Sequence, residues 1–234
     1  MATSIEMSGQ HVDVLVLAAH APELIGMRPH LKEQLMREVR GLFVVAKTIG
    51  VGIGVAGVGA ANRLNQLNPR CVILLGSCGV YPGAGDYQPL DMVIASRAHL
   101  FDPSAMAGKA EFPGPMQTAL DSHSGLAAGL AAAGPRCKLA PVATTMGITT
   151  DDPIARSVHG ATGFHAENLE LFPVAMACHA AKVPVAAVLG VTNLVGSTAR
   201  KDWMQFQRDA AVGAAEVIIT WIHNGAQGMP HKTP

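Results

Sequence analysis

Four polar residues stand at the ends of strongly apolar segments: Glu23, Ser77, Glu170 and Asn193. Carboxylates can serve as a general base or stabilise developing positive charge. An amide offers a hydrogen-bond donor and an acceptor together. Each residue alone is most simply a solvated loop residue or part of a tight turn. Their common position beyond apolar runs supports the hypothesis of one shared pocket.

The stretch from Gly163 to Asn193 contains two of these groups. Pro173 suits the first turn of a helix, where a missing N–H has no cost, so the sequence predicts a helix over 172–181. Glu170 then lies just before this helix. The apolar run 183–191 predicts a strand buried on both faces, with Asn193 just past its end. Because ligands bind beyond the carboxyl ends of strands in open α/β sheets, both side chains are expected at one crevice.

Apolar strands alternate with helical segments in the first half of the chain. Residues 12–19 predict a central strand that leads directly to Glu23, so another acid follows a strand. The run 71–75 predicts a buried strand that enters a turn at Gly76–Gly79, whose small residues allow a ligand to approach the backbone. The other predicted elements here are a helix over 31–39 that ends near Gly41, strands over 42–46 and 51–55, and a helix from 57 through 67.

The second half continues the alternation without a linker rich in Pro or Ser. The predicted elements are a strand over 91–96, a helix over 124–133, a strand over 139–144, a helix that starts within 149–153, and a last helix over 201–224. Residues 99–116 predict a long surface loop that could act as a lid. One α/β domain over 1–224 is the most economical organisation, followed by a flexible tail over 225–234.

Composition narrows the class of partner. Apolar residues make up 49% of the 234 residues and charged residues only 15%, which predicts a homo-oligomer, a dimer or larger. Lys plus Arg equals Asp plus Glu, at 17 each, so no basic surface is expected for nucleic acid or anionic lipid. The start lacks a signal-peptide pattern and no apolar run approaches the length of about 20 residues that spans a membrane, so we expect a cytoplasmic protein with no membrane contact.

Metal and cofactor sites find little support in the sequence. The four cysteines lack CxxC spacing and the histidines form neither HxH nor HExxH, so we expect buried free thiols and no metal. Gly52, Gly54 and Gly57 match GxGxxG, but no acid follows at the position that would bind ribose in a dinucleotide fold. Strand and turn packing is the favoured interpretation of these glycines, and no cofactor is expected.

Four motifs together resemble the purine nucleoside phosphorylase/nucleosidase superfamily over nearly the full chain: AAHAPEL (18–24), GSCG (76–79), AENLEL (166–171) and VTNLVGSTARKDW (191–203). The most similar branch is the hydrolytic one, which includes futalosine hydrolase and methylthioadenosine/S-adenosylhomocysteine nucleosidase. The resemblance implies a single-domain, three-layer α/β sandwich with a central twisted mixed sheet flanked by helices.

The resemblance also implies roles for residues at matching positions. Glu23 would activate water, Glu170 would bind the ribose hydroxyls, and Asn193 would contact the leaving base. The implied substrate-binding positions are Ser77, Cys78, Gly79, Gly147, Ile148, Leu169 and Trp203. Considered singly, Trp203 is more simply a packing residue than a substrate contact.

Departures within these motifs bear on the reaction. Nucleosidases that act on adenine have Asp where this chain has Asn193, and an amide suits a 6-oxopurine such as hypoxanthine. AAHAPEL lacks the arginine of the phosphorylases' phosphate loop, which favours hydrolysis. The resemblance therefore implies hydrolysis of futalosine to hypoxanthine and dehypoxanthine futalosine.

Three alternatives remain open at this point. They are a methylthioadenosine/S-adenosylhomocysteine nucleosidase, a purine nucleoside phosphorylase, and a non-catalytic nucleoside-binding protein. Leu169 replaces the usual Met, Leu171 replaces a small residue, and 97–103 matches the family only loosely. The group that the substrate carries at the ribose 5′ position is therefore left open.

Overall fold

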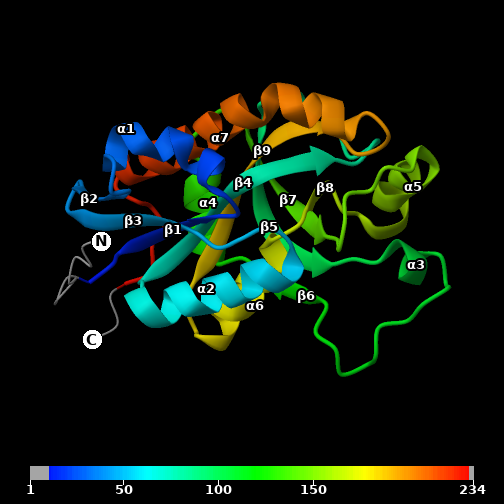
Figure 1. Ribbon diagram of the computed structural model, residues 1–234, viewed down its shortest axis with the longest axis horizontal. Helices are drawn as coiled ribbons and strands as arrows, with labels where there is room; N and C mark the ends of the chain where they lie inside the picture. The colour runs from blue at the N-terminus through cyan, green and yellow to red at the C-terminus, as the bar shows by residue number, and fades with distance from the viewer. Residues whose placement is uncertain (1–10, 232–234) are drawn as a thin grey trace, which may run out of the picture.

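Residues 11–231 are described by the computed structural model, and their strands form one sheet (Figure 1). The strands are β1 (Val14–Ala18), β2 (Met36–Val39), β3 (Leu42–Thr48), β4 (Cys71–Val80), β5 (Met92–Leu100), β6 (Ala119–Asp121), β7 (Cys137–Thr144), β8 (Ala166–Asn168) and β9 (Val185–Leu194). The helices are the 3-10 helix η1 (Ala21–Met27), α1 (Arg28–Leu31), α2 (Ile53–Leu67), α3 (Pro103–Met106), α4 (Ser124–Ala131), α5 (Asp152–Thr162), α6 (Leu171–Ala180) and α7 (Ala199–His223).

The sheet is mixed and partly closed on itself. β1 pairs in parallel with β3 and β4, and β4 pairs in parallel with β9. β9 then pairs antiparallel with β5, β5 pairs in parallel with β7, β7 pairs in parallel with β8, and β8 returns antiparallel to β4. These five strands form a closed ring. The ring brings the short strand β8 beside the carboxyl end of β4.

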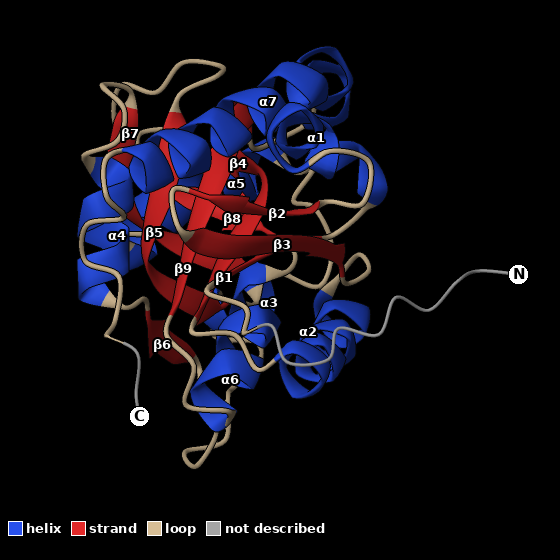
Figure 2. Cartoon of the chain, turned by 90° about the vertical axis from the view of Figure 1, so that its left-hand side faces the viewer, coloured by secondary structure: helices blue, strands red, loops and turns tan. Residues whose placement is uncertain are grey.

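Helices cover both faces of the sheet, as Figure 2 shows from the side. Residues of α2, α5 and α6 share one apolar core with the sheet, and residues of η1, α4 and α7 share the other. Leu15 and Leu17 of β1 point into the first core, whereas Val14 and Val16 point into the second. Burial on both faces explains why the central strands are continuous apolar runs. The predicted α/β class, with a mixed sheet between helical layers, is confirmed.

Two predicted elements of the first half are wrong. The helix expected over 31–39 is absent, because Lys32 and Leu35 have φ values of 62° and 53° that end helical geometry after α1. Met36–Val39 instead pairs antiparallel with β3 at the sheet edge. The strand expected over 51–55 is also wrong: Gly50 and Gly52 have positive φ values, and α2 begins at Ile53.

Several strands extend further than the sequence predicts. Gly76–Gly79, expected to form a turn, belongs to β4, which has a register shift between Cys78 and Gly79. Asn193, expected beyond its strand, lies within β9. The predicted loop over 99–116 contains the end of β5 and the short helix α3.

The last described segment packs against the protein body. Ala226 is buried, and the indole N–H of Trp221 donates to the carbonyl of Gln227 at 2.9 Å. Arg70 donates from Nε to the carbonyl of Pro230. Residues 225–231 of the segment expected to be flexible therefore make specific contacts, and 1–10 and 232–234 lie outside the described residues. None of the helices in the described range has the length and apolar character needed to cross a membrane.

Candidate active site

A cavity of about 500 Å³ opens where β1, β4 and β9 end, beside β8 and the start of α7. Its wall contains nearly all of the site residues expected from the sequence: Glu23, Ser77, Cys78, Gly79, Ile148, Leu169, Glu170, Asn193 and Trp203. Gly147 is the exception. It is exposed beside Ile148 but does not line the cavity. The fold thus collects side chains that are distant along the chain.

Glu23 is held by the turn that follows β1. Its Oε2 accepts hydrogen bonds from the backbone N–H of Ala19 at 2.8 Å and of His20 at 3.3 Å. Its Oε1 accepts none from the described residues and lies over Gly76, where an added Cβ would be only 3.5 Å away. One oxygen therefore anchors the carboxylate and the other is free to contact a ligand or water.

His20 lies beside the anchored oxygen of Glu23. Its Nδ1 is 3.2 Å from Glu23 Oε2, a charge contact without the alignment of a good hydrogen bond. Contact with the Glu23 carboxylate raises the pKa of His20 above its ordinary value, against the lowering effect of partial burial. His20 therefore places a group that can carry positive charge beside the anchored oxygen of Glu23.

Glu170 is the N-cap residue of α6 and is fixed by a dense set of backbone contacts. Asn168 Oδ1 accepts from the N–H groups of Glu170 and Leu171, both at 2.8 Å, and Thr144 Oγ1 accepts from Phe172 N at 3.0 Å. The next residue is a proline, which has no N–H. Every free donor at this helix start is thereby accounted for, and Glu170 has a defined orientation.

The Glu170 carboxylate points toward the start of α2. Its Oε1 accepts from Gly52 N at 2.9 Å, and Gly52, with φ 83°, is the N-cap residue of α2. Burial raises the pKa of Glu170 and the nearby Glu23 charge adds to this, although the Gly52 N–H acts in the opposite direction. No Lys or Arg within 11–231 forms an ion pair with Glu170.

A third carboxylate, Glu167, lines the same cavity but is saturated by protein donors. Tyr81 Oη donates to Oε2 at 2.8 Å, Thr149 Oγ1 to Oε2 at 2.6 Å, and Thr149 N to Oε1 at 2.9 Å. Burial and the Glu167 charge raise the pKa of Tyr81, so its hydroxyl remains a donor. Glu167 therefore fixes Thr149, and with it the adjacent Ile148 in the cavity wall.

Asn193 projects from β9 against the end of β4. Its Oδ1 accepts from Thr192 Oγ1 at 2.7 Å, and its Nδ2 donates to Leu194 O at 2.8 Å. A Cβ on Gly79 would lie 2.7 Å from Asn193 Nδ2, so this approach requires glycine. The amide keeps one further proton and one further lone pair for a ligand.

The remaining wall is largely apolar. Leu169, Ile148 and Val195 line it, and Trp203 donates from Nε1 to Ser77 Oγ at 3.2 Å. This hydrogen bond ties the first turns of α7 to β4. Arg200, one turn before Trp203, is exposed at the edge of the cavity. Apolar walls of this kind exclude water and strengthen the polar contacts within.

A family model described as the phosphorylase superfamily matches residues 8–223. The chain belongs to this superfamily. The resemblance stated from its motifs is thereby confirmed. No curated protein sequence matches the chain.

Solved superfamily members share the fold at low sequence identity. The 5′-methylthioadenosine/S-adenosylhomocysteine nucleosidase of Neisseria meningitidis, in complex with methylthio-immucillin-A, is 17% identical with a TM-score of 0.80, covering 91% of this chain and 99% of that one. The corresponding nucleosidase of Colwellia psychrerythraea, in complex with adenine, is 17% identical with a TM-score of 0.81, covering 95% and 99%. The futalosine hydrolase of Helicobacter pylori is 13% identical with a TM-score of 0.78, covering 91% and 98%.

Other residues of this superfamily member contribute to the site without having been given a site role from the sequence, among them His20, Gly52, Glu167, Asn168 and Thr192. Gly52 belongs to the GxGxxG match that was interpreted as packing, and its N–H in fact anchors Glu170. Asn168 and Glu167 carried a signal, because polar residues in AENLEL precede a buried helix. The contact of Gly52 with Glu170 spans 118 residues and had no local signal.

Proposed function

We propose that the chain hydrolyses the N-glycosidic bond of a purine nucleoside. The observation that carries this proposal is the pairing of Glu23 and Glu170 in one cavity, each anchored through one oxygen by backbone N–H groups. Asn193 lies in the same wall with unused hydrogen-bonding capacity. Cleavage of a ribosyl C–N bond leaves positive charge on the sugar and negative charge on the base, and this set of groups serves both ends.

On the sugar side, Glu170 binds the ribose hydroxyls and supplies negative potential beside the oxocarbenium-like sugar. Glu23 orients the attacking water and accepts its proton through Oε1. Leu169 packs under the ribose, and Trp203 completes an apolar wall that excludes bulk water.

On the base side, Asn193 donates its free Nδ2 proton to O6 of a 6-oxopurine, and its free Oδ1 lone pair accepts from N7 once the departing base carries a proton there. An amide is not a useful general acid, so the proton that the departing base finally takes comes from solvent. A 6-oxopurine protonated at N7 presents an acceptor at O6 beside a donor at N7, and this pair matches the free donor and the free acceptor of the amide. Ser77, Cys78, Gly79 and Ile148 form the rest of the base and ribose surface.

The preferred substrate is futalosine, with release of hypoxanthine and dehypoxanthine futalosine, a step of menaquinone synthesis. The amide at Asn193 favours this choice. Methylthioadenosine or S-adenosylhomocysteine is equally compatible with the fold, since nucleosidases for these substrates are among the similar structures. The apolar wall residues Val51 and Leu169 also suit a thioether group.

A panel of nucleosides separates these candidates. We expect purified protein to release a free base from futalosine, inosine or methylthioadenosine without added phosphate, as measured by chromatography of the products. Dependence on phosphate, with a sugar phosphate as product, indicates a phosphorylase. Binding in a thermal-shift assay without release of base indicates a non-catalytic nucleoside-binding protein.

The substitution Asn193→Asp tests the base site. An acid at this position accepts from a 6-amino group while its protonated form donates to N7, so we expect preference to shift from 6-oxopurine toward 6-aminopurine nucleosides by about tenfold or more. The ratio of kcat/KM for inosine and adenosine analogues measures the shift. An unchanged ratio contradicts the role of Asn193.

We further propose a homo-oligomer. Val55 and Val58 lie one turn apart on α2, and Val51 lies just before its start; the three are each more than half exposed, at 60%, 64% and 56%. An apolar stripe of this kind favours burial against another copy. Val55→Glu should lower the mass measured by analytical ultracentrifugation, and a monomeric wild type would contradict the proposal.

A further inference from the structure

A second cavity lies directly behind Glu23. It measures about 250 Å³ and runs between η1 and α7 down to the end of β4. Four residues line both cavities and form the partition between them: His20, Glu23, Ser77 and Trp203. The residues that line only the second cavity are Pro22, Ile25, Gly76, Met204, Gln207, Arg208 and Ala211.

This second cavity reaches from the surface to the free oxygen of Glu23. Its rim contains Pro22, Met204 and Arg208, all exposed, whereas its floor contains the buried Gly76. Glu23 Oε1 lies over Gly76 and accepts no hydrogen bond from the described residues. The second cavity therefore ends at the oxygen that must meet water.

Size and lining both suit water. A water molecule occupies about 30 Å³ in the liquid, so the second cavity holds several, whereas small-molecule pockets generally start near about 300 Å³. Gln207, Arg208 and Ser77 offer the polar partners that ordered water requires. The Glu23 carboxylate in the partition disfavours a bound anion at this position.

A nucleoside in the main cavity occupies the approach to Glu23 from that side. We propose that the second cavity is the route by which water reaches Glu23 while the nucleoside is bound. The hydrogen bond from Trp203 to Ser77 closes part of the partition between the two cavities. This inference rests on the proposed hydrolase function. The water oxygen bonds to the anomeric carbon, its proton passes to Glu23, and the C–N electron pair leaves with the base, which takes a proton from solvent.

Methanol competes with water as nucleophile and tests this route. Met204 and Gln207 line only the second cavity, and Met204 is exposed. The double variant Met204→Ala/Gln207→Ala widens the route, so the ratio of methyl glycoside to hydrolysis product should rise. We expect a rise of about tenfold, the usual effect of one methyl group on the selectivity of a pocket. Gln207→Trp narrows the route and should lower both this ratio and kcat, with KM unchanged.

Gln205→Trp is the matched control, because Gln205 is exposed on α7 and lines neither cavity. It should keep the wild-type product ratio. If wild type and Met204→Ala/Gln207→Ala give the same ratio of methyl glycoside to hydrolysis product, the route is overturned, even if Gln207→Trp fails to fold. A change in Gln205→Trp as large as that in Gln207→Trp also overturns it. A sugar phosphate formed only with phosphate also overturns it. Absence of base release from every nucleoside refutes the hydrolase function itself.

Discussion

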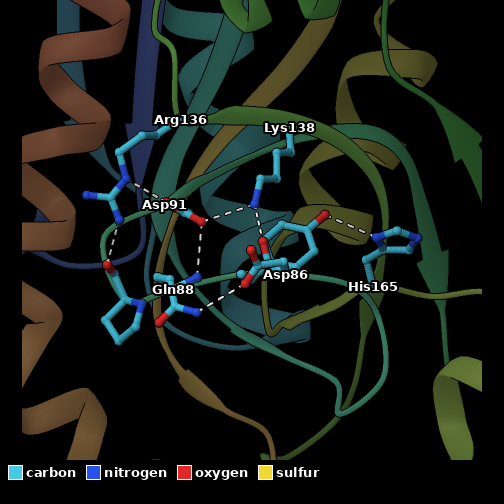
Figure 3. A network of polar contacts seen from close by, with 8 residues as sticks. Asp86, Gln88, Asp91, Arg136, Lys138 and His165 are labelled. Atoms are coloured by element: carbon cyan, nitrogen blue, oxygen red, sulfur yellow. Dashed lines mark hydrogen bonds and ion pairs between the residues drawn. The ribbon is translucent and has the colours of Figure 1, made fainter.

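Two sets of acids, one around Asp91 and the other made of Glu23 and Glu170, are held in opposite ways. Figure 3 shows the first, in which Asp91 accepts from Arg136 Nε at 2.6 Å, Lys138 Nζ at 3.2 Å and Gln88 N at 3.0 Å. Burial alone would raise the pKa of Asp91, but the Gln88 N–H and the two cations outweigh burial and lower it. Glu170, in the candidate active site, has no Lys or Arg partner among the described residues, and burial raises its pKa.

The surroundings of Asp91 extend this difference. Lys138 also lies 4.5 Å from the centre of the Tyr87 ring, and Tyr87 Oη is 3.0 Å from His165 Nδ1. Together these contacts fasten the connection between β4 and β5 onto β7. Asp91 thus has all its capacity used within the protein, whereas Glu23 and Glu170 keep free oxygens at a cavity. Both oxygens of Asp91 are occupied by cations and a backbone N–H, whereas Glu23 and Glu170 each keep one oxygen that accepts no hydrogen bond from the described residues.

The largest expected effect follows removal of a free carboxylate. Glu170→Gln and Glu23→Gln should each lower kcat by about a hundredfold or more, the usual cost of removing one preorganised charge contact. The thermal midpoint of Glu170→Gln should not fall, because burial already disfavours the Glu170 charge. Steady-state kinetics and thermal unfolding measure the two properties. Near-normal turnover in either variant removes that residue from the mechanism.

An intermediate effect is expected for Glu167, which belongs to the cavity wall but is saturated like Asp91. The three donors from Tyr81 and Thr149 cannot all be matched by the amide in Glu167→Gln, so stability should fall by about 1 to 3 kcal/mol. The displaced Ile148 should lower kcat/KM less than Glu170→Gln does. Urea unfolding and kinetics measure both, with Thr149→Ser as the control that keeps the hydroxyl. A loss of activity as large as that of Glu170→Gln would make Glu167 catalytic.

A smaller effect on stability is expected when Asp91 is replaced. Arg136 and Lys138 are about half exposed, at 54% and 41%, so they return readily to water when Asp91→Asn removes their partner. We expect a loss of about 1 kcal/mol in the free energy of unfolding and unchanged kinetics. Urea unfolding with a matched assay of base release tests this. If Asp91→Asn lowers activity without lowering stability, Asp91 is not the purely structural acid that the comparison with Glu23 and Glu170 requires.

The sequence predicted the elements that present the site better than the contacts that hold it. Apolar runs located the central strands, and Pro173 located the start of α6 because a proline fits only the first turn. These positions sufficed to bring Glu23, Glu170 and Asn193 to one cavity. The anchor of Glu170 was missed because Gly52 lies 118 residues away, and only the fold brings it near.

Wrong and missed elements have causes that the residue types do not reveal. Lys32 and Leu35 adopt positive φ values that side chains rarely adopt, so the apparent helix over 31–39 breaks. β8 has only three residues, too few to show an alternating pattern, and it forms because β4 and β7 lie on either side of it. The first case is a backbone conformation unusual for its residue types, and the second depends on tertiary strand pairing.

The smallest expected effect is the opposite pH dependence of the two acids. Glu170 has a folded-state pKa above 4.5, so its charge destabilises the folded protein at higher pH. As pH falls through this raised pKa toward 4.5, wild type should gain stability relative to Glu170→Gln and lose activity. Asp91 has a pKa below 3.8, so its stabilisation is complete above 3.8 and is lost as pH falls through the lowered pKa. Urea unfolding of wild type, Glu170→Gln and Asp91→Asn across pH measures both trends, and parallel curves for all three proteins would contradict the contrast between a cation-paired acid and a backbone-anchored one.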